Sequence, residues 1–273
     1  MLWLVHAFVI LFGLVIGSFL NVCIYRIPRQ MSVVRPRSRC PRCNKPIKAW
    51  QNVPVLSYVW LRGRCADCGE RISIQYPIVE LITAGAFYLL FSKYGLMPAF
   101  WVNAAFFSIL IALTVIDLFH RLLPDVLTIS GVVLGFALAP FQSSEFFTGA
   151  ADASGVTLTP VRYLESFLGV AFGAGLLWIT AKLYFRVKKV EGMGYGDIKM
   201  MAMIGAFLGW RFALLTIFAG SLLGAVIGLA YIALSGKGRR YELPFGTFLG
   251  FGAAFVTMWG ARLLGWYLSR TLS

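Results

Sequence analysis

The sequence is poor in charged residues, and acidic residues and histidine are especially few. Only 13% of its 273 residues are charged, with 11 aspartates and glutamates and two histidines, while 59% are hydrophobic. The mean hydropathy is +0.78. Soluble globular domains carry about 25% charged residues, so this composition excludes that class and predicts a polytopic membrane protein.

Long apolar runs take up most of the chain. A helix needs about 20 apolar residues to cross a hydrocarbon core of ~30 Å. We identify eight such runs and predict an all-α polytopic fold with about eight transmembrane helices. The runs are centred on Val9, Ala86, Ser108, Val133, Ala174, Gly205, Gly224 and Ala254, and the sixth is short and rich in glycine. Glycines at four-residue spacing, such as Gly13 and Gly17, predict closely packed helices.

Basic residues give the chain a net charge of +14, but they do not indicate nucleic-acid binding. A nucleic-acid surface would collect them in one stripe with interleaved aromatic residues. Here most of them lie in three loops, which eight spans place on one side of the membrane. By the positive-inside rule that side is cytoplasmic, so we expect both termini on the other side. The basic residues of these loops are Arg26, Arg29, Arg35, Arg37, Arg39, Arg42, Lys45, Lys48, Arg62, Arg64, Arg71, Arg186, Lys188, Lys189, Lys237, Arg239 and Arg240.

The start of the chain lacks the features of a secretory signal peptide. The first apolar run, residues 2–24, has no Lys or Arg before it and is followed by basic residues instead of a small-residue cleavage site. We therefore expect an uncleaved anchor. This divides the chain into a first transmembrane helix (1–25), a cytoplasmic four-cysteine zinc-binding module (26–76) and a polytopic membrane domain (77–273).

Cysteine is also scarce, yet four of the five cysteines form two C-x-x-C pairs. Cys40 and Cys43 make the first pair, Cys65 and Cys68 the second, and 21 residues separate the pairs. This spacing is close to that of a zinc ribbon, in which four thiolates hold one structural Zn²⁺. Two disulfides are the alternative, but the basic flanks place the loop in a reducing cytoplasm. We expect a zinc-ribbon-like module with no open coordination position.

The residues next to these pairs fit metal-binding turns. Asn44 and Gly69 directly follow the second cysteine of each pair, and both residue types tolerate a left-handed backbone. The fifth cysteine, Cys23, lies in the first apolar run and is expected to be a small buried hydrophobic residue.

Two of the few acidic residues stand at the ends of apolar runs. Asp197 follows alternating glycines in the segment GMGYGD, residues 192–197, and Asp117 lies at the end of the third run. The predicted topology places both on the cytoplasmic side. Two neighbouring carboxylates can share a proton, so that one activates a water molecule and the other protonates an amide nitrogen, as in aspartic peptidases.

A purely structural interpretation of these aspartates is the alternative. Asp117 can pair with Arg121 one turn later, and Asp197 can cap the helix that follows it. Asp125 is expected in the first turn of a helix, where the helix dipole stabilises it. The protein would then be a zinc-ribbon membrane scaffold or a proton-coupled transporter. Against this, no acidic residue lies in the middle of a span, where a proton relay would need one.

Seven segments together resemble the bacterial prepilin peptidases. They are GSFLNVCIYR (17–26), the two C-x-x-C pairs, YPIVEL (76–81), DLFHRLLPD (117–125), GMGYGD (192–197) and PFG (244–246). Each segment is weak alone, but their order along nearly the whole chain is that of the family.

The resemblance implies a bifunctional enzyme of the bacterial inner membrane, belonging to type IV pilus or type II secretion systems. Such enzymes resemble GxGD-type aspartic proteases, remove the basic leader of prepilins and pseudopilins after a glycine, and N-methylate the new N-terminal residue with S-adenosylmethionine. Asp117 and Asp197 match the two catalytic aspartates of the family. The active site would face the cytoplasm, and the termini the periplasm.

The methyltransferase activity has no signature of its own. No G-x-G-x-x-G follows a predicted strand, so a Rossmann-type cofactor site is absent. Family members without the cysteine module resemble peptidase-only enzymes, which implies that the first span and the zinc loop carry methylation. We expect Asn21, Arg26, Tyr58 and Glu80 to contact the methyl donor or the new amine. Packing, lipid anchoring or helix capping is the alternative for each.

Two features depart from what the resemblance suggests. The basic first loop would repel a basic leader, so we expect it to serve anionic membrane lipids or the methyl donor. The polar stretch at 141–160 lengthens the outer connection between the two catalytic segments, where we expect an unstructured insertion.

Overall fold

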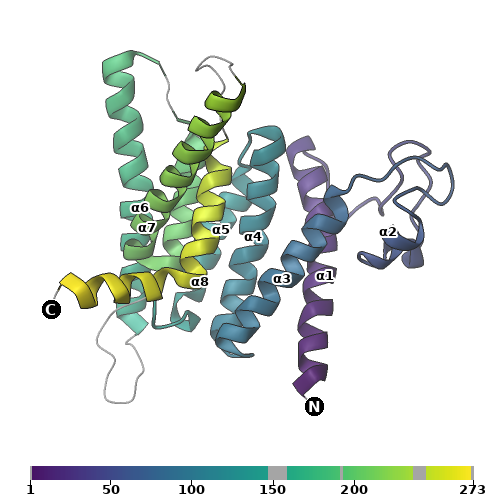
Figure 1. Ribbon diagram of the computed structural model, residues 1–273, viewed down its shortest axis with the longest axis horizontal. Helices are drawn as coiled ribbons and strands as arrows, with labels where there is room; N and C mark the ends of the chain where they lie inside the picture. The colour runs from purple at the N-terminus through teal and green to yellow at the C-terminus, as the bar shows by residue number, and fades with distance from the viewer. Residues whose placement is uncertain (1, 147–158, 191–192, 236–243, 272–273) are drawn as a thin grey trace. The chain divides into compact units, whose positions relative to one another are not determined.

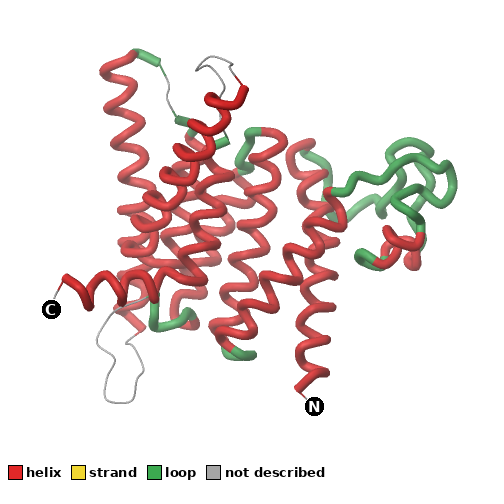
Figure 2. The backbone as a smooth tube through the Cα atoms, viewed as in Figure 1, coloured by secondary structure: helices red, strands yellow, loops and turns green. Residues whose placement is uncertain are grey.

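The computed structural model describes residues 2–146, 159–190, 193–235 and 244–271. Helices make up the regular secondary structure in these ranges, apart from isolated β-bridges (Figure 1, Figure 2). Five of the helices are long and apolar enough to cross a membrane. The predicted all-α membrane fold is therefore confirmed. The chain divides into two compact units, Met1–Ala112 and Leu113–Ser273.

The first unit is built on the pair formed by α1 (Leu2–Arg26) and α3 (Gln75–Tyr94), followed by the start of α4 (Pro98–His120). Glycine allows α1 and α3 to touch through their backbones. A Cβ atom on Gly17 would lie 2.6 Å from the Cα of Glu80, too close for any side chain. The prediction that glycines at four-residue spacing serve close helix packing is confirmed here.

The long connection between α1 and α3 forms the cysteine module. It contains η1 (Ile27–Arg29), η2 (Ala49–Asn52) and the short helix α2 (Leu56–Trp60). Between residues 27 and 74 only Cys40 and Gly63 are buried. The module therefore has almost no apolar core of its own, and another interaction must hold it together.

The second unit begins with the end of α4. It continues with α5 (Asp125–Leu138), η3 (Ala139–Phe141), α6 (Thr159–Lys188), α7 (Tyr195–Ser235) and α8 (Phe245–Thr271). Within this unit, α4 ends, α5 begins, and α7 and α8 begin at the same end (Figure 1). The candidate catalytic segments all lie at that end.

Gly209 divides α7 into two legs. This residue has φ 72° and ψ 173°, a backbone conformation that residues other than glycine rarely adopt. Near the start of α8, Gly246 bonds to Asp197 of the first leg, and further along α8, Gly260 contacts Phe212 just past the break. The first leg therefore runs along α8 in the same direction, and the second leg returns (Figure 1).

Buried side chains satisfy two carbonyls near the break. Ser166 Oγ donates to the oxygen of Ala206 at 2.8 Å, and Gln142 Nε2 donates to the oxygen of Phe207 at 3.0 Å. The last carbonyls of a helix have no partner within it, so these bonds stabilise the end of the first leg. They explain why polar side chains are buried at the end of the unit opposite to the aspartates.

The eight predicted apolar runs correspond to α1, α3, α4, α5, α6, the two legs of α7, and α8. Two of them are weaker spans, because α5 has only 14 residues and α3 is not among the five apolar helices. The predictions for residues 147–158 of the polar stretch and for Gly192, Lys237, Arg239 and Arg240 lie outside the described residues.

Candidate active site

Asp117 lies in the last turn of α4, with its side chain buried. Thr247, in the first turn of α8, donates two hydrogen bonds to its Oδ2 atom. The backbone N–H lies at 2.6 Å and the hydroxyl at 2.9 Å. The first N–H groups of a helix have no partner within it, so the start of α8 is suited to hold a carboxylate.

Asp197 lies in the first turn of α7, in the glycine-rich segment GYGD at residues 194–197. Its carboxylate accepts hydrogen bonds from the backbone N–H groups of Gly194 and Gly246. Its own N–H donates to the oxygen of Gly194 at 3.2 Å. The helix begins at Tyr195, so Asp197 stands inside the first turn and not at the capping position that the structural interpretation suggested.

Gly246 brings the two carboxylates together. Its N–H bonds to Asp197, and a Cβ atom at this position would lie 3.0 Å from Oδ2 of Asp117. The two carboxylates are close enough to interact electrostatically. The structure thus gathers the ends of α4, α7 and α8 around one pair of acids. The sequence pointed to residues 244–246, whereas Thr247, the residue directly after them, was missed.

Leu123 fills the space beside the pair. It belongs to the loop between α4 and α5, and its side chain would lie 2.9 Å from a Cβ atom on either Gly196 or Gly246. Any side chain at these two glycines would displace the loop. This contact gives the glycines of the GYGD and PFG segments a packing role next to the aspartates.

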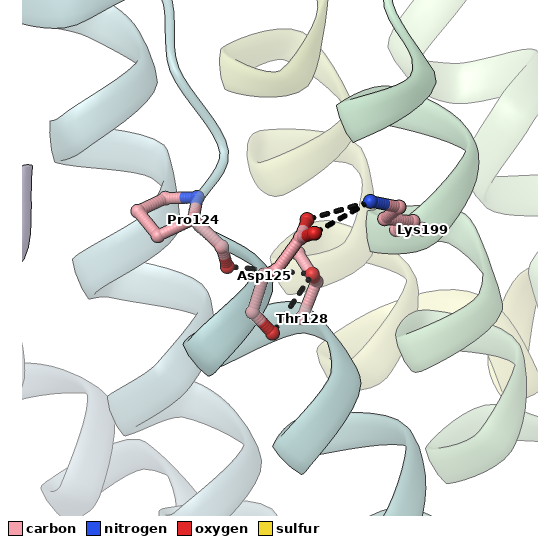
Figure 3. Close-up of polar contacts among 4 residues, drawn as sticks. All are labelled: Pro124, Asp125, Thr128 and Lys199. Atoms are coloured by element: carbon pink, nitrogen blue, oxygen red, sulfur yellow. Dashed lines mark hydrogen bonds and ion pairs between the residues drawn. The ribbon is translucent and has the colours of Figure 1, made fainter.

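Asp125 forms an ion pair with Lys199 next to the site (Figure 3). Lys199 Nζ lies 2.7 Å from Oδ1 and 2.8 Å from Oδ2 of Asp125. Asp125 is in the first turn of α5, as predicted. The Thr128 hydroxyl donates to the oxygen of Pro124 at 3.3 Å in the same turn. Because Lys199 is only two residues past Asp197, the ion pair ties the start of α5 to the part of α7 that carries this acid.

The four cysteines of the module form one cluster. The sulfur atoms of Cys40, Cys43, Cys65 and Cys68 all lie within 4.8 Å of one another, so the cluster can bind a metal ion. Cys40 Sγ and Cys68 Sγ are 3.8 Å apart, far beyond the ~2.05 Å of a disulfide. The alternative of two disulfides is therefore not what the structure contains.

Each cysteine pair sits in the same kind of turn. Cys40 N–H donates to the oxygen of Lys45 at 3.0 Å, and the equivalent bond from Cys65 to Glu70 is 2.8 Å. The predicted left-handed residues are confirmed, with φ 57° at Asn44 and 72° at Gly69.

Electrostatics in the cluster favour a thiolate at one cysteine. A hydrogen bond from the Cys43 backbone is the main cause that lowers the pKa of the Cys40 thiol to about 7. Two ion pairs link the turns, Arg42 with Glu70 at 2.6 Å and Lys45 with Asp67 at 3.1 Å. Thiolates are the form that binds metal, so this environment suits a metal site.

Two of the four candidates for methylation hold the module in place. Arg26 is buried and donates to the oxygens of Ser32 at 2.9 Å and Pro36 at 2.8 Å. Tyr58 OH donates to the oxygen of Ile72 at 3.4 Å. These contacts are with the loop itself, as the packing alternative suggested.

The other two candidates lie on facing turns of α1 and α3 and are both buried. Glu80 accepts a bond from the Val55 N–H at 2.7 Å. Asn21 Nδ2 donates to the oxygen of Tyr76 at 3.0 Å, while its Oδ1 is buried without a hydrogen-bond partner. A buried acceptor of this kind is uncommon and suits a ligand that donates hydrogen bonds.

These features define a class: a multi-pass membrane protein with two clustered aspartates at the ends of its helices and a four-cysteine module between its first long helices. The sequence-family model of the bacterial peptidase A24 N-terminal domain matches residues 11–94. The sequence-family model of the type IV leader peptidase family matches residues 104–229. The chain belongs to the type IV leader peptidase family.

Curated relatives are similar over nearly the full length. A prepilin leader peptidase/N-methyltransferase of Aeromonas salmonicida is 36% identical over 300 residues, covering 99% of this chain and 96% of the relative. Proteins with the same name from Legionella pneumophila and Pseudomonas aeruginosa are 33% and 34% identical, covering 97% and 95% of this chain and 95% and 92% of their own lengths. No solved structure gives a significant match.

Proposed function

We propose that the protein is an aspartic endopeptidase that cuts the basic leader from prepilins and pseudopilins after a glycine, and that Asp117 and Asp197 are its catalytic residues. The observation that carries this proposal is the placement of both carboxylates around Gly246. One carboxylate takes a proton from water as its oxygen attacks the scissile carbonyl carbon. The other donates a proton to the amide nitrogen as the C–N bond breaks.

Thr247 orients Asp117 for this chemistry. Both of its hydrogen bonds go to Oδ2, so we assign Oδ1 as the oxygen that faces the water. We propose that an extended substrate pairs with backbone groups of the glycine-rich segment beside Asp197.

The second proposed activity is methylation of the new N-terminal residue. S-adenosylmethionine supplies the methyl group. The neutral amine would take the methyl group, the electrons of the broken C–S bond would stay on the donor's sulfur, and the proton that the amine releases would pass to water. Asn21 and Glu80 are the proposed contacts, because their buried acceptors suit an amine, and Arg26 and Tyr58 are proposed to hold the surrounding loop.

The metal of the cysteine cluster is proposed to be a structural zinc ion. In a tetrahedral site with Zn–S bonds of about 2.3 Å, the sulfur atoms are about 3.8 Å apart. The distance between Cys40 and Cys68 is 3.8 Å. Four thiolates fill the coordination sphere, so the zinc would fold the module without touching substrate.

The charges of the loops support a proposed membrane topology. We propose an inner-membrane protein whose active site faces the cytoplasm and whose termini face the periplasm, divided into an anchor helix (1–25), the zinc module (26–76) and the peptidase domain (77–273). The membrane would then present the junction between a basic leader and an apolar helix to Asp117 and Asp197.

Intact-mass spectrometry of a purified prepilin incubated with the enzyme tests both activities. Without S-adenosylmethionine we expect loss of the leader alone. With it, we expect the same loss plus one methyl group. An uncut prepilin in both reactions would contradict the proposed peptidase, and a cut but unmethylated product in the second would contradict the methyltransferase.

A further inference from the structure

The η2–α2 segment (residues 49–60) exposes large apolar side chains outside the membrane-spanning helices. Trp50, Leu56, Val59 and Trp60 are 55%, 68%, 68% and 84% exposed, respectively. Exposed apolar residues that gather in one short segment mark an interaction site, because water does not favour them there. The peptidase mechanism and the metal cluster use none of these side chains.

The segment is tied to the membrane helices by Glu80. This buried carboxylate accepts the N–H of Val55, the residue before α2, at 2.7 Å. Glu80 packs against Gly17 of α1, roughly two and a half helical turns before Arg26 at the basic end of that helix. The start of α2 is thus held beside a part of α1 that lies within a candidate membrane span.

Val55 fixes the direction of the segment through a strained turn. It has φ 59° and ψ −48°, and Leu56 N–H donates to the oxygen of Pro54 at 2.6 Å, which makes a γ-turn. A β-branched residue rarely adopts this conformation, so the surrounding structure must impose it. The turn keeps Leu56 and Trp60 on the outside of the module.

The charges near the segment are positive. Lys48, Arg62, Arg64 and Arg71 are exposed. The two acidic residues of the module, Asp67 and Glu70, are already paired with Lys45 and Arg42. Basic residues beside exposed tryptophans are the composition of a segment that lies in the headgroup region of an anionic membrane.

We propose that the η2–α2 segment is an interfacial anchor, which inserts Trp50, Leu56, Val59 and Trp60 into the anionic lipid surface of the membrane that α1 crosses. This interaction would hold the module at a fixed depth. It goes beyond the proposed peptidase and methyltransferase activities and depends on neither.

Photo-crosslinking in nanodiscs tests the anchor directly. The full chain carries p-benzoylphenylalanine in place of Trp60, in nanodiscs of phosphatidylcholine with phosphatidylglycerol. The matched control carries the same group in place of Ala66, which is exposed on the second cysteine turn. We expect a phospholipid adduct by intact mass at position 60, about tenfold above position 66. Equal adducts at the two positions, or an adduct at 60 only with a second protein chain or an added prepilin, would overturn the proposal.

Hydrogen exchange of the unsubstituted protein gives a second test that needs no variant. We expect amides of residues 49–60 to exchange about tenfold more slowly in nanodiscs with phosphatidylglycerol than in phosphatidylcholine alone, because each nearby basic residue adds attraction to anionic lipid. Exchange rates that do not differ between the two lipid compositions would overturn the anionic anchor.

Discussion

The cysteine module and the aspartate site are organised by opposite means. Between residues 27 and 74 the module buries only Cys40 and Gly63, and four sulfur atoms within 4.8 Å of one another form its centre. The aspartates instead lie among tightly packed helix ends, where Gly246 leaves no room for a side chain. The first region therefore depends on its sulfur ligands and the second on backbone packing, so we expect different variants to disrupt each.

Loss of either aspartate should give the largest effect and should leave the module intact. Asp117→Asn or Asp197→Asn removes a proton donor or acceptor, so we expect the rate of prepilin cleavage to fall about 10²–10⁴-fold. The test measures initial rates of prepilin cleavage in detergent and the zinc content of each variant by elemental analysis. Cleavage at the wild-type rate by either variant would show that the two acids are not the catalytic pair.

Loss of a cysteine ligand should give the reverse pattern. In Cys68→Ser, or after chelation, we expect loss of the zinc and of methylation, because structural zinc contributes about 10–16 kcal/mol to folding of such modules. Leader cleavage should continue. Cys23→Ala is the matched control, since this cysteine is buried in α1 and belongs to neither pair. If Cys68→Ser retained its metal, the assignment of this ligand would be wrong.

A smaller effect is expected from Thr247→Val, which removes the hydroxyl bond to Asp117 and keeps the N–H bond. A hydrogen bond to a charged group contributes about 1.5–3 kcal/mol, so cleavage should slow about 10–100-fold. Thr257→Val is the control in the same helix, because its hydroxyl donates to the Ala253 oxygen at 2.7 Å, away from the aspartates. An equal loss of rate in both variants would indicate general damage to α8.

The smallest effect should come from the ion pair of Asp125 and Lys199. Both side chains are partly exposed, at 58% and 40%, and such pairs contribute about 0.2–1 kcal/mol. We expect Asp125→Asn to slow cleavage about two- to fivefold, because the start of α7 would be less constrained without the ion pair. The charge-swapped variant Asp125→Lys/Lys199→Asp should recover part of the rate in the same assay. If the cleavage rate did not recover, Asp125 would affect cleavage by something other than its ion pair with Lys199.

The sequence predicted the parts of the protein that depend on local patterns. The apolar runs marked the helices, the C-x-x-C spacing marked the metal cluster, and the left-handed Asn44 and Gly69 followed from their places in it. The helices and the left-handed turns depend only on residues close together in the sequence. The cysteine cluster depends on the C-x-x-C spacing that binding of one metal ion requires.

Contacts over long separations were harder to predict. Thr247 holds Asp117 across 130 residues, and the pairing of Asp125 with Lys199 spans 74. The two legs of α7 were predicted as separate runs, but not that Gly209 alone forms the break between them, because one glycine among many gives no sign of its φ. These contacts and this break depend on packing between segments that are far apart in the sequence. A single sequence does not show which distant segments pack together.

The central claim is that peptide cleavage and methylation use separate regions of one chain. The most direct test supplies an already cleaved pilin and S-adenosylmethionine to the Asp197→Asn variant, with one methyl group per pilin read by intact mass. We predict methylation at the wild-type rate, although this variant does not cut a prepilin. A variant that keeps its zinc but leaves the cleaved pilin unmethylated would contradict the separation.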